Sequence, residues 1–161
     1  MVGIPASVRC LLAVLLGLVL SGCGQSEQKE VPYQFTSDVK HTMSILLEPA
    51  AEIIWDSAGT IETLEGIEDL RPTTEEGWAK VQHAATVVAE TGNLLMMPGR
   101  NRGSDWQEIS QGLITTGQAA LNAAQKQDAD ALFEAGGQIY NVCVSCHQLY
   151  WTEGSSRFST D

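Results

Sequence analysis

The stretch DADALFEAGGQIYNVCVSCHQLY (residues 128–150) decides the fold, because one run of residues carries both a helical pattern and a cysteine motif. Asp128 stands where it can cap a helix. The inward-facing positions that follow recur at helical spacing, and they are Leu132, Gly136, Ile139, Cys143 and His147. The pattern predicts a C-terminal helix whose last turns carry the sequence Cys143-Val144-Ser145-Cys146-His147.

These five residues match the pattern C-x-x-C-H, by which a c-type haem is attached to a protein. Two thiols add across the two vinyl groups of one haem, and the adjacent imidazole reaches the iron as proximal ligand. The sequence therefore predicts one covalent haem c, held by Cys143 and Cys146, with His147 as the proximal iron ligand.

Other uses of the motif fit the sequence less well. A zinc site needs about four ligands, and outside the motif the folded part of the chain offers only His41, His83 and carboxylates. A thioredoxin-like redox pair needs a strand, helix, strand context, which is missing around a helical pattern. A disulfide between residues three apart in a helix would be strained. Haem attachment remains the preferred interpretation.

Three further amphipathic helices precede the motif. The first begins at Ser37. It contains Pro49, which lacks a backbone N–H, so we expect a bend there. The residues predicted to face inward are Val39, Met43, Leu46, Ala50, Ile53 and Ser57. The second opens with the capping-box pair Thr73 and Glu76, must stop by Pro98, and has as its inward face Trp78, Val81, Ala84, Ala85, Val88 and Leu95. The third follows Ser104 as N-cap, with Trp106, Ile109, Leu113, Thr116, Ala120 and Ala123 facing inward.

The segment from Gly59 to Pro72 is interpreted as a long connection without strand or helix. Four amphipathic helices without an alternating strand pattern predict an all-α fold, an antiparallel four-helix bundle with one haem c on its C-terminal helix.

The N-terminus indicates export. A single early charge, Arg9, precedes an apolar run that is long enough for a signal-peptide core and short for a membrane span. Leu20-Ser21-Gly22-Cys23 then resembles the lipobox of bacterial lipoproteins, which implies a lipid on Cys23. The expected organisation is a signal peptide (1–22), a lipidated tether (23–34), a helical bundle (35–153) and a C-terminal tail (154–161).

The net charge of −11 makes nucleic acid an unfavourable partner and favours a basic surface on any partner met through charge.

The four cysteines agree with the predicted export and lipid anchor. Cys10 leaves with the signal peptide and Cys23 carries the anchor, so the folded domain retains only the two cysteines of the motif. In an oxidising compartment, a covalent use for both thiols is the economical explanation.

A C-terminal C-x-x-C-H on the last of four antiparallel helices resembles the class II cytochromes c, the cytochrome c-prime group, over about residues 35–150. The resemblance implies that a residue on the first helix faces the distal side of the iron, which places Met43 there as sixth ligand. The family also has a basic residue, commonly Arg, near the haem propionates. This chain has Lys40 near that position instead, which could neutralise a propionate without a bidentate contact.

The resemblance implies two alternative functions. With Met43 on the iron, the protein is a carrier in one-electron transfer to redox partner proteins; with a five-coordinate iron, it binds nitric oxide or carbon monoxide. An enzyme is not expected, because no paired carboxylates or distal His/Arg group stands near the motif. The expected location is the periplasmic face of a bacterial membrane, inner or outer, and a homodimer is left open by the helix faces.

Overall fold

The structure is a computed structural model that describes residues 32–151. The predicted signal peptide (1–22), the predicted lipidation site Cys23 and the predicted C-terminal tail (154–161) lie outside the described residues. From Phe35 onward the chain forms one compact unit. Within residues 32–151, no helix is both long enough and apolar enough to cross a membrane.

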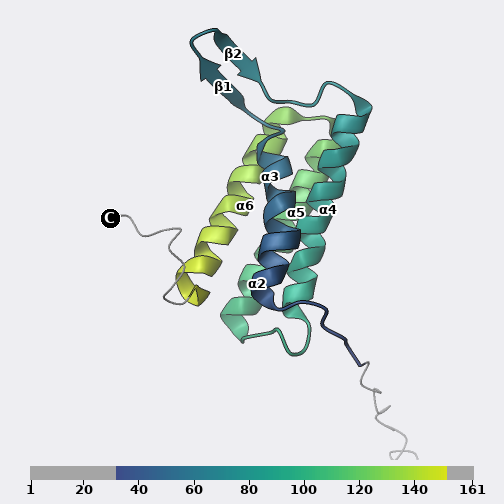
Figure 1. Cartoon of the computed structure of the whole chain (residues 1–161), viewed down its shortest axis with the longest axis vertical. Helices are drawn as coiled ribbons and strands as arrows, with labels where there is room; N and C mark the ends of the chain where they lie inside the picture. The colour runs from purple at the N-terminus through teal and green to yellow at the C-terminus, as the bar shows by residue number, and fades with distance from the viewer. Residues whose placement is uncertain (1–31, 152–161) are drawn as a thin grey trace, which may run out of the picture. The chain divides into compact units, whose positions relative to one another are not determined.

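The compact unit is mostly helical, which confirms the predicted class. Its helical elements are α2 (Val39–Thr42), η2 (Met43–Leu47), α3 (Glu48–Trp55), α4 (Glu75–Met96), α5 (Ser104–Lys126) and α6 (Ala129–Tyr150). The first three are consecutive turns of one helix. This first helix packs on α4 and, through α3, on α6, while α5 packs on both α4 and α6 (Figure 1).

One hydrophobic core lies between these helices. The predicted inward faces of the second and third helices are confirmed, since Trp78, Val81 and Val88 of α4 are buried, as are Trp106 and Leu113 of α5. Ile109 alone of the predicted α5 face is only half-buried. Straight α-helices keep their 3.6-residue period, so a regular apolar stripe is a reliable guide to the buried face.

Two glycines let α4 and α5 come unusually close. A Cβ atom on Gly117 would lie 2.6 Å from the backbone nitrogen of Ala89, and one on Gly92 would lie 2.7 Å from the carbonyl oxygen of Ser110. The indole of Trp106 reinforces this contact by donating a hydrogen bond of 2.7 Å to the carbonyl oxygen of Leu95. The α4 and α5 pair is thus packed backbone against backbone.

Pro49 disturbs the first helix in the turn that precedes it. Met43–Leu47 forms a turn of π-helix, in which the backbone N–H of Glu48 donates to the carbonyl oxygen of Met43. Proline lacks the N–H that an α-helix needs, and its ring crowds the carbonyl four residues earlier. A widened turn at this place relieves that crowding. The sequence predicted a bend at Pro49, and the structure has a π-helical turn just before it.

The π-helical turn changes which residues of the first helix face inward. The predicted stripe is only partly right after Met43. Ala50 is buried and Ile53 packs against the core, as predicted. Leu46, however, is 37% exposed, whereas Leu47 is 7% exposed and Ile54 is fully buried. One extra residue in a turn rotates everything after it by about 100°. An unbroken helical period therefore places Leu46 on the inward side and misses Leu47 and Ile54.

Three of the four predicted N-caps are displaced by one residue. The caps are Asp38 for the first helix, Thr74 for α4, Gly103 for α5 and Asp128 for α6, where the sequence predicted Ser37, Thr73, Ser104 and Asp128. Adjacent Ser, Thr and Asp side chains all suit an N-cap, so residue type alone does not choose between them.

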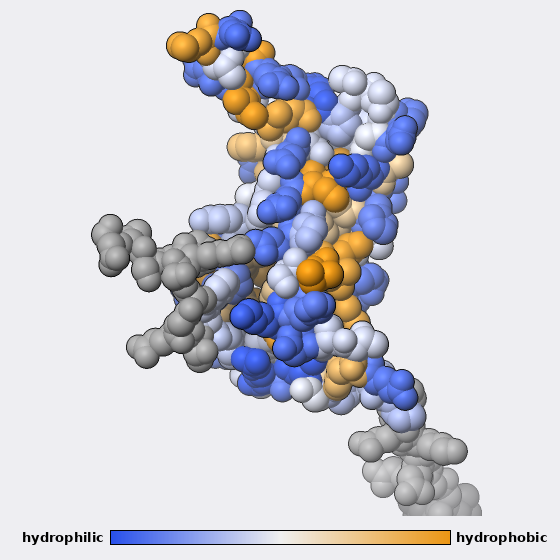
Figure 2. Space-filling model, in the orientation of Figure 1, coloured by the Kyte–Doolittle hydropathy of each residue, from blue (hydrophilic) through white to orange (hydrophobic). Residues whose placement is uncertain are grey.

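The segment predicted to be a plain connection contains a β-hairpin, so that prediction is wrong. Strands β1 (Thr60–Thr63) and β2 (Gly66–Asp69) pair antiparallel, with Thr60 opposite Asp69. The hairpin projects beyond the helices at the end where α3 finishes and α4 begins (Figure 1). Both strands are exposed on both faces, and apolar residues gather on the hairpin in the space-filling view (Figure 2). No buried face imposes an alternating pattern, so the usual strand signal is missing.

The contact between α4 and α5 predicts the effect of two glycine substitutions. Gly117→Ala places its methyl group against backbone atoms of α4 and should lower the free energy of unfolding by about 1–3 kcal/mol. Gly137→Ala is the matched control, because nothing lies within 4 Å of its added Cβ, and helix propensity should raise the free energy of unfolding by about 0.5–1 kcal/mol. Urea unfolding followed by circular dichroism measures both. Equal stabilities for the two variants would contradict the packing.

Candidate haem-attachment site

The buried half of α6 fixes the direction in which the motif faces. Leu132 and Ile139 are fully buried and set the rotation of the helix. Cys143 and Cys146 continue the same stripe into the last turns, where both are partly buried and packed against the core. The two thiols therefore lie about one helical turn apart on the inward side of α6.

The two thiols are free and strongly disfavour ionisation. Cys143 and Cys146 are not joined in a disulfide. Burial first, and then the neighbouring Cys146, raise the pKa of the Cys143 thiol to about 11. Burial also raises the pKa of Cys146, and the positive charge of Arg102 partly opposes that effect. The chain therefore presents two neutral thiols at neutral pH.

His147 stands beside the second cysteine in a partly apolar setting. Burial lowers its pKa, while the nearby Glu48 carboxylate acts in the opposite direction with a smaller effect. The indole of Trp151 meets the imidazole edge-on, with ring centroids 4.3 Å apart. A histidine held neutral at neutral pH is in the form that binds a metal. The influence of Glu48 also shows that the first helix approaches the end of α6.

Arg102 and two aromatic rings lie together near the motif. The guanidinium of Arg102 lies 4.9 Å from the ring centroid of Trp106 and 6.0 Å from that of Tyr150. The rings of Trp106 and Tyr150 meet edge-on at 4.9 Å. The sequence placed Arg102 only in a loop. Its proximity to Cys146 arises from the way the loop before α5 folds against α6, which no local pattern encodes.

The residues predicted on the first helix lie in different surroundings. Met43, in the π-helical turn, is partly buried and packs against the same core as the two cysteines. Lys40 is exposed on α2, and His41, predicted to be solvated, is exposed beside it. His83, predicted to be a surface residue, is exposed on α4. Thus Met43 shares the core with the motif, whereas Lys40 stands in solvent.

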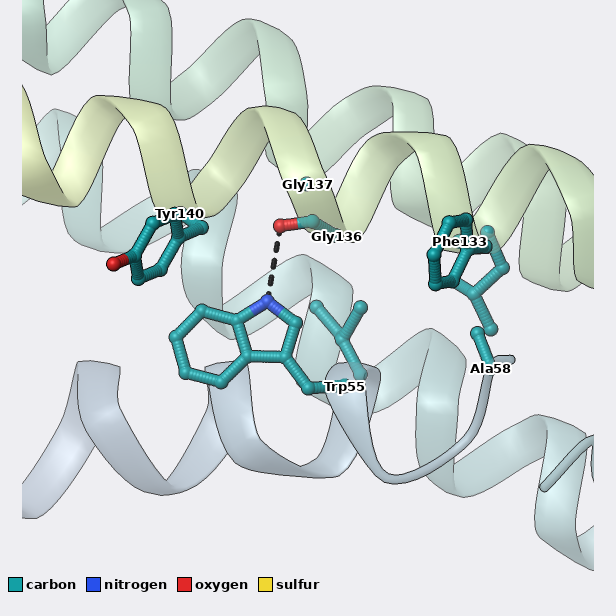
Figure 3. Close-up of a pocket in the computed structure, with 8 residues that line it drawn as sticks. Trp55, Ala58, Phe133, Gly136, Gly137 and Tyr140 are labelled. Atoms are coloured by element: carbon teal, nitrogen blue, oxygen red, sulfur yellow. Dashed lines mark hydrogen bonds between the residues drawn. The ribbon is translucent and has the colours of Figure 1, made fainter. Parts of the chain in front are cut away.

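An apolar hollow of about 290 Å³ lies between α3 and α6, toward the hairpin side of the motif. Figure 3 shows the indole of Trp55 reaching from α3 to α6, where its N–H donates to the carbonyl oxygen of Gly136 at 2.9 Å. Phe133 and Tyr140 flank that contact from α6. A Cβ on Gly136 would lie 3.1 Å from the indole. This contact fixes α3 against α6 one to two turns before Cys143.

The chemistry of the donor side chains fits a covalent haem. Two neutral thiols one turn apart and an adjacent imidazole are the side chains that c-type attachment uses. At the same end of the helices, Ile45 and Leu46 of the first helix and Leu149 of α6 expose large apolar side chains. Cys143, Cys146 and His147 would hold the haem group, with Met43 on the first helix.

Comparison with protein-family models, curated proteins and solved structures finds no match to this chain. Within residues 32–151, no group of three or more His, Cys, Asp or Glu side chains is arranged to hold a metal ion. That finding does not bear on a haem iron, which takes only one or two ligands from protein side chains.

The raised thiol pKa predicts slow alkylation of Cys143 in the haem-free chain. With a pKa of about 11, about one Cys143 thiol in a thousand is ionised at pH 8, and only the thiolate reacts. Iodoacetamide should therefore modify the variant Cys146→Ser at least tenfold more slowly when folded than in urea. The variant Cys143→Ser reports the less hindered Cys146 for comparison. Equal rates in folded and unfolded Cys146→Ser would refute the buried environment of Cys143.

Proposed function

We propose that this chain is a lipid-anchored, periplasm-facing, mono-haem cytochrome of the class II c type, acting in one-electron transfer. The observation that carries the proposal is the C-x-x-C-H motif on the last turns of α6, with Cys143 and Cys146 on the core side and His147 beside them. The proposal includes the finer description of the helices as an antiparallel four-helix bundle; the contacts of α4 with α5 and of α5 with α6 support it.

Each residue of the site has a definite part in this proposal. Cys143 and Cys146 would hold the haem through two thioether bonds, and His147 would supply a nitrogen ligand to its iron. The edge-on contact with Trp151 and the nearby Glu48 restrain the imidazole, as groups around a metal ligand commonly do. The bound haem supplies a one-electron couple, and the chain's own residues set its position and surroundings.

Met43 is proposed as the sixth ligand of the iron. Its side chain is partly buried against the core that also receives the cysteines, and it lies in the π-helical turn before Pro49. Turns of π-helix inside α-helices occur often at functional sites, because the extra residue redirects side chains. A thioether ligand would saturate the iron and suit an electron carrier, whereas an iron without it would bind nitric oxide or carbon monoxide.

The anchor and the partner complete the proposal. A lipid on Cys23, which lies outside the described residues, would hold the domain at the membrane through the tether. The mature domain is strongly acidic, so a redox partner with a basic surface would be favoured by electrostatic steering. Neither the anchor nor the partner is needed for haem attachment, and each can be tested separately.

The proposed iron ligation predicts a low-spin spectrum in both oxidation states. Met43→Ala should convert the iron to the high-spin form and allow the ferrous protein to bind carbon monoxide, because the sixth position then lies open. Absorption and resonance Raman spectra of the purified haem-containing protein measure both changes. Met96→Ala and Met97→Ala are the matched controls, since these are the other methionines of the described residues. A wild-type protein that is already high-spin would favour the gas-binding alternative.

A further inference from the structure

The loop between α4 and α5 holds a buried arginine with an unused donor. Arg100 is 9% exposed, and its Nη2 donates to the carbonyl oxygen of Ser37 at 2.8 Å. The ring of Phe35 covers one face of the guanidinium, 4.8 Å from its centre. Nη1 is buried and has no hydrogen-bond partner among the described residues. An unsatisfied buried donor on a charged group is costly, so this atom requires an explanation.

Among the described residues, no carboxylate forms an ion pair with Arg100 or with Arg102, two residues further along the same loop. Within residues 32–151, Arg71 forms an ion pair with Asp69 on the exposed hairpin side of the molecule, whereas Arg100 forms none. Arg102 lies over aromatic rings and likewise forms no ion pair there. In a chain with far more acidic than basic residues, it is unexpected that two arginines in one short loop find no acidic partner among residues 32–151. Arginine is the side chain best suited to bind a carboxylate through two parallel hydrogen bonds.

The loop lies at the end of the helices that carries the motif. In Figure 1 it connects α4 and α5 at the end where α2 begins and α6 finishes. The guanidinium of Arg102 lies 6.0 Å from the ring centroid of Tyr150, on the last turn of α6. Arg100 reaches the start of the first helix through Ser37, whose hydroxyl bonds to that of Thr42, the residue before Met43. The two arginines thus join the cysteine side of the site to the Met43 side.

We propose that Arg100 and Arg102 bind the two propionate carboxylates of the haem, and that Lys40 does not. This inference rests on the proposed function, because it needs a haem on Cys143 and Cys146. Arg100 offers a donor shielded from water, where a charge-assisted hydrogen bond is strong. Lys40 is a solvated point charge. Positive charge held beside the haem would also stabilise the reduced iron and raise the reduction potential.

The test is the reduction potential of the exported, haem-containing full chain, measured by spectroelectrochemistry at constant ionic strength. Arg100→Gln and Arg102→Gln should each lower the equilibrium constant for reduction by about tenfold, which is about 59 mV for a one-electron couple. Resonance Raman bands of propionate bending should shift in the same two variants. Arg100→Lys, which keeps the charge but not the planar fork, should shift the bands while changing the potential less.

Two lysine variants are the controls. Lys40→Gln removes the rival cation, and Lys126→Gln makes the same charge change at the far end of α5, about 33 Å along the helix. Both should leave the potential and the propionate bands unchanged. The proposal is overturned if either glutamine variant of the arginines keeps the wild-type potential and bands, or if Lys126→Gln shifts the potential as much as they do.

A merely structural role for Arg100 has a different signature. Holding Ser37 alone would lower the unfolding temperature of Arg100→Gln without changing the potential or the propionate bands, and that result also overturns the proposal. Arg102 is exposed, so its variant is expected to fold normally. Failure of the proposed function is recognised separately, because the wild-type chain would then carry no covalent haem at all.

Discussion

The packing of Leu132 and Ile139 into the core fixes the rotation of α6, and the geometry of the motif depends on that rotation. Because Cys143 and Cys146 continue the same helical stripe, the thiols face the other helices instead of solvent. The contact between Trp55 and Gly136 then fixes α3 against α6 shortly before the motif. Residues that stabilise the fold and residues that would perform chemistry are therefore successive turns of one helix.

The end of the helices that carries the motif differs from the rest of the core. Around α4 and α5, glycine contacts bring two backbones together, and the side chains between them are fully enclosed. Around the motif, Met43 and the cysteines are only partly buried, and Leu149 is exposed. The closely packed helices thus support an end at which Met43 and the two cysteines are only partly buried. A covalently bound, flat cofactor would complete the burial of that end.

The buried faces of the regular helices could be predicted from the sequence. The irregular turn of the first helix, the exposed hairpin and the burial of Arg100 could not. The faces of α4 and α5 followed from regular apolar spacing, because nothing interrupts those helices. In the first helix, Leu46 was predicted to face inward, but Leu47 is the buried residue, because a π-helical turn disturbs the register there. The hairpin was not predicted, because neither of its faces is buried and its strands therefore lack an alternating apolar pattern. Arg100 could not be recognised as buried, since its partner Ser37 lies 63 residues away in the chain.

Covalent attachment of one haem through both cysteines is the central claim, and the mass of the purified exported protein tests it most directly. After denaturation and acid extraction, the wild-type chain should retain the added mass of a single haem, and a proteolytic peptide containing Cys143 and Cys146 should carry it. The double variant with both Cys143→Ser and Cys146→Ser should lack the added mass. A wild-type chain produced in a host competent for c-type haem attachment, with the mass of the polypeptide alone or with haem removed by acid extraction, would contradict the account.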